Sequence, residues 1–337
     1  MNYFITGGTG FIGTHLANLL HEVHPEAKIY NLDIVEPGTP LPTVKNYKPA
    51  LGKGEEHAAT FIYCDVRQPI ELEKVDITPD DVIFNFAAVH RTPGHPDPAY
   101  FETNIRGAEN VCAFAERHGI RKIVFTSSIA PYGAAEELKE ETTLPMPNTP
   151  YGISKLVAEK IHQTWQAGGE GRQLTIVRPG VVFGRGENGN FTRLYWGIRG
   201  HKFMYPGRKD TIKACIYVKE LVRFMLYSSE YHDSGVEMYN CCYEPAYTLE
   251  HLVESINRGT KMTVTVTFMP GWLIMTAAGI AGALGSPMGI CPARVRKLQI
   301  STNICGKKLS ASGYRFHYTF EEALADWYKD NGNLYLQ

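Results

Sequence analysis

The sequence predicts an α/β fold in which a doubly wound parallel sheet carries helices on both faces. Short apolar runs with strand character alternate with longer runs of helical periodicity through the first half of the chain. A glycine-rich turn joins the first of these strands to the first helix. After about residue 180 the alternation weakens. We therefore place the sheet domain in residues 1–180 and a smaller C-terminal α/β lobe, mainly for substrate, in 181–337, with some segments returning to the sheet domain.

The individual elements follow from the same patterns. Expected strands are runs of four to seven residues rich in β-branched and aromatic side chains, and expected helices repeat apolar residues every three or four positions. Residues 36–58 contain four prolines and three glycines, which predicts a long surface loop. In the second half we expect a strand over 262–268 and a helix over 320–330. The other strands are 2–6, 28–33, 60–64, 81–86, 121–127 and 173–178, and the other helices are 12–23, 98–117 and 150–168.

The turn after the first strand has the spacing G-x-x-G-x-x-G. In a dinucleotide site Gly7 would permit the sharp turn, Gly10 would let the backbone approach a pyrophosphate, and Gly13 would let helix and strand pack closely. The following helix begins around Phe11 and Ile12, and its N-terminus offers free N–H groups and a positive dipole end to phosphate. A strand, a glycine-rich turn and a helix in this order predict a dinucleotide-binding loop.

Asp33 ends the second strand, twenty residues after Gly13. A carboxylate there can accept hydrogen bonds from both hydroxyls of an adenine ribose and would repel a 2′-phosphate. The next residues, Ile34, Val35 and Glu36, include no cation for such a phosphate. The sequence thus favours NAD over NADP. The alternative is that Asp33 only starts a turn.

Two further strand ends carry polar or small residues. Asp65 and Val66 offer an adenine an acceptor and an apolar contact, and Ala87 and Ala88 leave room for the cofactor backbone. His90 follows as a candidate for substrate binding. Because ligands bind at the carboxyl ends of strands in open parallel sheets, we expect these residues to gather at one edge.

Composition excludes several other classes of protein. The formal net charge is −1, so there is no basic field to hold nucleic acid. The seven cysteines are an odd number without C-x-x-C spacing, which predicts reduced thiols in a cytoplasmic protein and no metal site. Because the sequence starts directly on a core strand, we expect no signal peptide.

The segment between Pro270 and Pro292 has no charged residue. Its length is just enough to span a bilayer, but its five glycines and Pro287 argue against a span. We expect instead a buried or interfacial helix over roughly 271–284, and no contact with a membrane.

Tyr151 and Lys155 begin the third helix and are four residues apart, so both lie on one helix face. A neighbouring ammonium favours a phenolate and should lower the pKa of Tyr151. With the positive charge of NAD⁺ added, the phenol becomes a base for a sugar hydroxyl. Ser128, at the end of the fifth strand, could bind the same substrate oxygen; the alternative is that it only caps the strand.

These motifs together resemble the extended short-chain dehydrogenase/reductases, in the branch of NAD-dependent nucleotide-sugar epimerases and dehydratases, over nearly the whole chain. The resemblance implies that Ser128, Tyr151 and Lys155 are catalytic, that Lys155 and Tyr151 also bind NAD, and that the protein is a homodimer through helices 98–117 and 150–168. Further residues matched to the cofactor site of that family are Asn104, Ser127, Pro179, Val181 and Val182.

Three positions depart from the family pattern. Members that eliminate water across C5 and C6 have an acid pair directly after the catalytic hydroxyl, whereas this chain has Ile129 and Ala130. Neither side chain can act as an acid or a base. Many epimerases have Asn where this chain has Gly180, so this chain lacks that side chain for binding the nucleotide-sugar. The run from residue 178 to 184 also resembles the 3β-hydroxysteroid dehydrogenases.

The sequence therefore favours an NAD-dependent epimerase of a nucleotide-diphosphate sugar, with C4 as the expected carbon. The alternative is a net dehydrogenase or reductase of a keto-sugar or a 3β-hydroxysteroid-like alcohol, and a third possibility is a non-catalytic NAD-binding protein. Cations and amides of the second lobe suit a diphosphate. The substrate candidates are Asn190, Arg193, Arg199, Lys213 and Arg294, with Tyr217 either beside them or structural.

Overall fold

The computed structural model describes residues 1–39, 51, 55–90, 94–231, 235–283 and 299–337. A parallel sheet of seven strands in the order β12-β7-β5-β4-β1-β2-β3 forms its larger part. All six strands predicted for the first half are present within one or two residues. They are β1 (Asn2–Thr6), β2 (Lys28–Asp33), β3 (Thr60–Tyr63), β4 (Val82–Asn85), β5 (Lys122–Thr126) and β7 (Gln173–Pro179), to which β12 (Gly235–Cys241) adds an edge strand.

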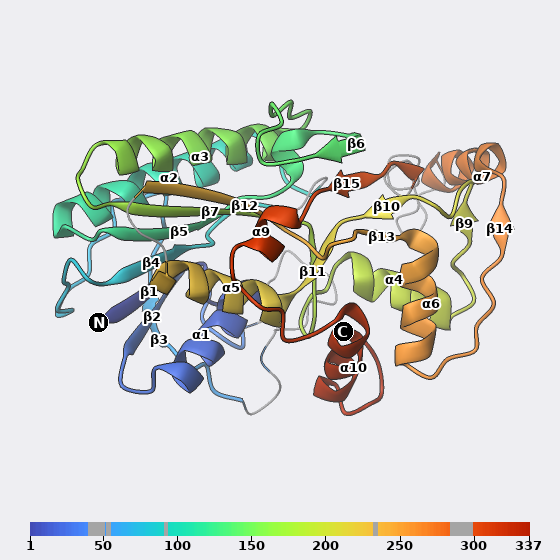
Figure 1. The fold of residues 1–337 in the computed structure, drawn as a ribbon, viewed down its shortest axis with the longest axis horizontal. Helices are drawn as coiled ribbons and strands as arrows, with labels where there is room; N and C mark the ends of the chain where they lie inside the picture. The colour runs from blue at the N-terminus through green and yellow to red at the C-terminus, as the bar shows by residue number, and fades with distance from the viewer. Residues whose placement is uncertain (40–50, 52–54, 91–93, 232–234, 284–298) are drawn as a thin grey trace.

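Helices cover both faces of this sheet (Figure 1). One face packs on α1 (Phe11–Val23) and α5 (Val218–Tyr231), and the other on α2 (Asp97–His118) and α3 (Pro150–Ala167). The central strands are buried on both sides, which explains why they read as continuous apolar runs. The predicted doubly wound α/β fold is confirmed.

Helix ends are defined by local chemistry. The Thr149 hydroxyl accepts a hydrogen bond from the Gly152 N–H, and Pro150 takes the first helical position of α3. At the other end of its neighbour, Gly119 adopts φ 69° after the last turn of α2. These caps fix where α3 begins, and hence where Tyr151 stands in its first turn.

A smaller α/β lobe follows, with an aromatic core around Phe183 and Trp327. A four-stranded sheet has the order β13-β10-β15-β6, and two short strand pairs, β11-β8 and β14-β9, complete it. Its strands are β6 (Ala135–Lys139), β8 (Val181–Phe183), β9 (Tyr205–Pro206), β10 (Ile212–Lys213), β11 (Cys215–Tyr217), β13 (Tyr247–Thr248), β14 (Phe268–Met269) and β15 (Thr302–Ile304). Its helices are α4 (Asn190–Arg199), α6 (Leu249–Gly259), α7 (Gly271–Ala283), α9 (Lys307–Ala311) and α10 (Phe320–Asp330), and a short 3₁₀ turn, η1 (Ala130–Tyr132), precedes β6. The boundary placed at residue 180 stays a prediction.

Two expectations for the second half need correction. The strand predicted over 262–268 is wrong except at Phe268, which begins β14. Val264 and Val266 do pack against the lobe, but the Val264 carbonyl accepts a hydrogen bond from the Asn257 side chain instead of a neighbouring strand. In this segment the alternating apolar residues indicate burial and not pairing with a neighbouring strand. The helix predicted over 320–330 is confirmed as α10.

Helix α7 confirms the helix expected near 271–284, but the described side chains of α7 are not buried. Trp272 is 72% exposed and Ile280 is 59% exposed. The buried alternative is therefore wrong for these side chains, because no hydrophobic cluster of the described residues includes them, and the interfacial alternative stays a prediction. None of the helices that the structure describes has the length and apolar character needed to cross a membrane.

Candidate active site at the carboxyl ends of the parallel strands

Strands β1 and β4 lie side by side although they are not consecutive, so the chain leaves them in opposite directions. At such a switch point the strand ends open a ligand site. Gly7 turns there with φ 71°, and a Cβ on it would lie 2.9 Å from the Ala87 backbone nitrogen. A Cβ on Gly13 would lie 2.5 Å from the Gly8 Cα. The loop and α1 are thus packed at a distance that only glycine permits, which fits a dinucleotide.

The Asp33 carboxylate organises this loop. It accepts hydrogen bonds from the Thr9 N–H at 3.1 Å and from the Val35 N–H at 3.0 Å. Burial raises the pKa of Asp33. Asn31 donates to the Thr9 hydroxyl at 2.9 Å, so Thr9 and Asn31 are site residues that the sequence analysis missed. Their only signal was a polar residue inside an apolar strand.

At the end of β3, Asp65 is engaged by Arg67. The guanidinium donates to both carboxylate oxygens, at 2.6 Å for the shortest contact, and this bond holds the pKa of Asp65 below its usual value. The two residues are partly or largely exposed, so a ligand could compete for the carboxylate. Val66 is buried, and a Cβ on Gly107 would lie 3.0 Å from its Cγ2. Its role toward adenine stays a prediction.

Asn104 positions the segment that follows β4. Its amide accepts from the Val89 N–H at 2.8 Å and donates to the Val89 carbonyl at 3.1 Å and to the Ser154 hydroxyl at 2.9 Å. Ser154 in turn donates to the Tyr151 carbonyl. Asn104 therefore ties the loop carrying Ala88 to the first turn of α3. Ser154 went unnoticed because serine within a helix is common.

Tyr151 is half-buried at the start of α3, and a hydrogen bond links its hydroxyl with Ser128. Burial raises the pKa of Tyr151 to about 12, against the smaller opposing effect of Ser128. The expected lowering of this pKa is therefore wrong for the ligand-free protein. The physical reason is that desolvation of the phenolate outweighs the donors present.

Lys155 lies one turn further on and is 2% exposed. Its Nζ lies 4.4 Å from the centre of the Phe125 ring. Burial lowers the pKa of Lys155 to about 7, and Glu159 opposes that shift. The structure thus joins Ser128 and Tyr151 by a hydrogen bond, while the Lys155 ammonium, one helical turn further on, lies over the Phe125 ring.

Ser127 takes a different direction from Ser128. Its hydroxyl donates to Glu159 at 2.5 Å, and Glu159 also accepts two hydrogen bonds from Arg178 at 2.8 and 2.5 Å. Glu159 and Arg178 are 1% and 2% exposed. The hydroxyl is committed to this buried network between α3 and β7, which leaves only the Ser127 main chain for the predicted cofactor contact. Glu159 is a supporting residue that the sequence analysis missed.

The segment after Ser128 closes toward β7. The Ile129 N–H donates to the Pro179 carbonyl at 3.3 Å, and Ala130 begins η1. A Cβ on Gly180 would lie 2.6 Å from the Ala214 carbonyl oxygen. The glycine is therefore required by the close approach of the chain entering β8 to the chain entering β11, and an asparagine would not fit this backbone. Val181 and Val182 follow in β8 and are half-buried.

The substrate candidates are spread over the second lobe. Asn190 is the first residue of α4, where it accepts from Arg193 at 2.8 Å. The Glu187 carboxylate accepts from the N–H groups of Phe191 and Thr192, so an acid already caps this helix N-terminus. A diphosphate binding there would have to displace it.

The other candidates separate into several environments. Lys213 donates to the Ile300 carbonyl at 2.6 Å, and burial lowers its pKa to about 8. His90 is exposed. Arg199 donates to the Tyr195 hydroxyl and the Leu334 carbonyl, away from the strand ends. The buried Tyr217 donates to Asp326, which supports its structural alternative. Arg294 lies outside the described residues.

Similarities to known proteins fit this geometry. Residues 3–242 match the profile of the NAD dependent epimerase/dehydratase family. The chain is similar to N-acetyl-alpha-D-glucosaminyl-diphospho-ditrans,octacis-undecaprenol 4-epimerase of Escherichia coli O157:H7, with 30% identity over 96% of this chain and 93% of that protein. It is 26% identical to dTDP-glucose 4,6-dehydratase of Streptomyces antibioticus, over 98% and 93%. The UDP-glucuronic acid 4-epimerase of Bacillus cereus, solved with NAD, has the same fold, with a TM-score of 0.71 at 18% identity over 98% and 99% of the two chains.

Proposed function

Since this chain belongs to the NAD-dependent epimerase/dehydratase family, we propose that it inverts the configuration at C4 of a sugar carried on a diphosphate. NAD is its cofactor, and nucleotide-diphosphate sugars are the substrate class that the sequence predicts. The observation that carries the proposal is the hydrogen bond between Ser128 and Tyr151, with Lys155 one helical turn further on. The glycine-rich loop lies at the same end of the sheet. Ile129 and Ala130, which follow Ser128, can neither donate nor accept a proton.

In the proposed mechanism Tyr151 takes the proton of the C4 hydroxyl while Ser128 holds the same oxygen by a hydrogen bond. When bound, NAD would supply the hydride chemistry at C4, with the oxidised form as acceptor and the reduced form as donor to the opposite face of the sugar. A phenol with a pKa of about 12 is a poor base near neutral pH. In the working complex we expect the charge of Lys155, which lies one helical turn from Tyr151 with its Nζ over the Phe125 ring, to favour the phenolate.

The residues at the cofactor site fit this role. We assign the pyrophosphate to the loop at Gly7 to Gly13 and the N-terminus of α1, and the adenine ribose to Asp33. The nicotinamide falls to Pro179, Val181 and Val182, which line the end of β7 and the start of β8.

The reaction class is tested by the mass of the product. The pure protein is incubated with a panel of UDP-hexoses and UDP-hexosamines, and products are separated and weighed. Unchanged mass with a new retention time supports the epimerase. A product lighter by one water would show that other groups replace the missing acid pair at Ile129 and Ala130. A change of two hydrogens with stoichiometric turnover of NAD(H) would assign the protein to the dehydrogenase alternative.

We further propose a cytoplasmic homodimer. All six cysteines that the structure describes are free thiols, which supports a reducing compartment. For a dimer through the helices at 98–117 and 150–168, Val111 and Phe114 of α2 are buried in the core of the chain and are not available as contacts. Ile153 and Val157 of α3 are exposed at i and i+4, and they supply an apolar stripe.

A further inference from the structure

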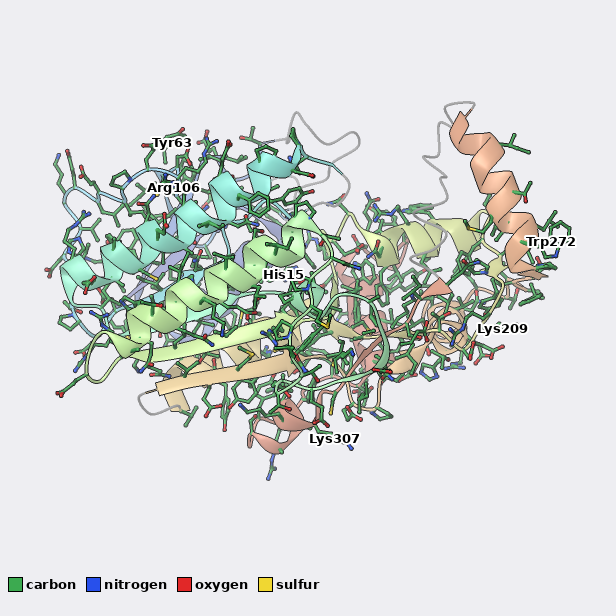
Figure 2. The ribbon with its side chains drawn as sticks, turned by 90° about the horizontal axis from the view of Figure 1, so that it is seen from above. His15, Tyr63, Arg106, Lys209, Trp272 and Lys307 are labelled. Carbon is green, nitrogen blue, oxygen red and sulfur yellow. The ribbon has the colours of Figure 1, made fainter. Side chains whose placement is uncertain are left out.

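Helix α7 is an apolar element whose side chains Trp272, Leu273 and Ile280 are left exposed by the rest of the chain that the structure describes. None of its described side chains belongs to a buried hydrophobic cluster. The helix begins at Gly271, which packs against Gly207: a Cβ on Gly271 would lie 3.6 Å from the Gly207 Cα. Figure 2 shows α7 standing away from the second lobe, with Trp272 at its lower end. Exposed apolar side chains gathered on one helix, here Trp272, Leu273 and Ile280, are typical of a binding surface.

The charge of the sequence around α7 is one-sided. Residues 255–320 contain no Asp or Glu at all, although the chain has 35 acids. The same 66 residues carry eight of the 34 cations, in a protein whose overall charge is −1. Although Arg258 and Lys308 form ion pairs with acids outside this segment, the remaining positive charge of the sequence favours an anionic surface. Those eight are Arg258, Lys261, Arg294, Arg296, Lys297, Lys307, Lys308 and Arg315.

The dimensions of α7 limit what it can do in a bilayer. Its 13 residues rise about 20 Å, which is less than the hydrocarbon thickness of about 30 Å. Tryptophan prefers the boundary between water and hydrocarbon, and Trp272 is the most exposed side chain described in α7. A helix with these properties can enter one leaflet from the side without crossing the membrane.

We propose that α7 binds the surface of an anionic lipid bilayer, and that this contact gives the active site access to sugars whose diphosphate is esterified to a membrane lipid. The second half of this inference rests on the proposed function. It replaces the expectation of no membrane contact and develops the interfacial alternative for the helix at 271–284. The similarity to a relative whose printed substrate is a diphospho-undecaprenol sugar agrees with it, over 96% of this chain.

Vesicle flotation tests the anchor without any activity measurement. The wild-type protein should float with phosphatidylglycerol/phosphatidylcholine vesicles and bind pure phosphatidylcholine less well. Trp272→Ser with Ile280→Ser should weaken vesicle binding by roughly tenfold or more, because two exposed apolar side chains no longer enter the lipid. Tyr63→Ser with Leu334→Ser is the matched control, since these side chains are 69% and 64% exposed on other elements; it should float like wild type.

Contrary results are equally clear. If neither the wild-type protein nor the Tyr63/Leu334 control floats, or if the Trp272/Ile280 variant floats as well as wild type, α7 is not a lipid anchor. If instead the mass by light scattering falls from dimer to monomer in that variant, α7 is covered by a second copy and the proposal is overturned. Unchanged circular dichroism and NAD binding of the variant exclude misfolding as the cause of a loss.

Turnover of two substrates then tests the lipid-linked class. Wild type should invert both a polyprenyl-diphosphate hexosamine in anionic vesicles and a soluble UDP-hexosamine. The Trp272/Ile280 variant should lose roughly tenfold on the first and stay close to wild type on the second. Inversion of the UDP-sugar alone by wild type would overturn the lipid-linked class. Turnover of neither would defeat the proposed function itself, while flotation would still decide the role of α7.

Discussion

At the residue scale, one phenol carries the proposed proton transfer. Tyr151→Phe should lower turnover by about 100-fold or more, because it removes the hydroxyl that is hydrogen-bonded to Ser128 and is proposed to take the substrate proton. NAD binding should be unchanged by titration calorimetry. Tyr100→Phe is the matched control: its ring centre lies 6.3 Å from that of Tyr151, and most of the activity should remain. Near wild-type rates for Tyr151→Phe would remove it from the mechanism.

Cofactor choice also depends on a single residue. Asp33 should make NAD bind more tightly than NADP, because its carboxylate repels a 2′-phosphate. Asp33→Ala should weaken the binding of NAD by roughly 1–2 kcal/mol if two hydrogen bonds to the ribose are lost. The difference in affinity between NAD and NADP should become smaller by the same amount. Calorimetric titration of both cofactors measures it. Tighter binding of NADP to the unmodified protein would reverse the assignment.

Buried Lys155 should make stability depend on pH. Its pKa falls from 10.5 to about 7 on folding, so the unfolded chain binds more protons between these values. Below about pH 7 the buried charge of Lys155 lowers the free energy of unfolding, and this loss disappears as the pH rises from about 7 toward 10. Lys155→Met should be more stable than wild type in urea near pH 6, with the difference shrinking toward pH 10. Lys160→Met, at an exposed position of the same helix, should show no such trend.

At the element scale, a buried ion pair joins α3 to β7. Glu159→Gln should lower the free energy of unfolding by about 3–5 kcal/mol, because Arg178 keeps its charge without a counter-ion. Urea denaturation measures the loss. The control is Glu109→Gln in the exposed pair of Arg106 and Glu109, where the loss should stay below about 1 kcal/mol. Equal losses in both variants would show that the buried pair does not hold α3 in place.

The same scale shows how far patterns predict elements. Strands such as β1 and β7 were found because strands buried on both faces have few sequence alternatives. The prediction of a strand over 262–268 was wrong because Val264 and Val266 pack inward without a strand partner. Pairing depends on which backbone lies alongside, and periodicity carries no information about that.

At the scale of the whole molecule, the proposed dimer depends on the outer stripe of α3. Ile153→Asp with Val157→Asp should give a monomer in light scattering at micromolar concentration, because two carboxylates would be buried in the interface. Wild type should have twice the mass of one chain. A monomeric wild type, or a variant that stays dimeric, would place the contact elsewhere or remove it.

The sequence by itself determined the fold class, the position of the glycine-rich loop and the identity of the residues around Tyr151. These are written in local spacing: three glycines at intervals of three, and a phenol and an amine one helical turn apart. Only the tertiary structure decided how these groups behave. Desolvation raises the pKa of Tyr151 and lowers that of Lys155, and it arises from neighbours distant in sequence such as Phe125. The conflict of Gly180 with the Ala214 carbonyl and the exposure of α7 likewise depend on which surfaces meet, and this is a property of the packed chain as a whole.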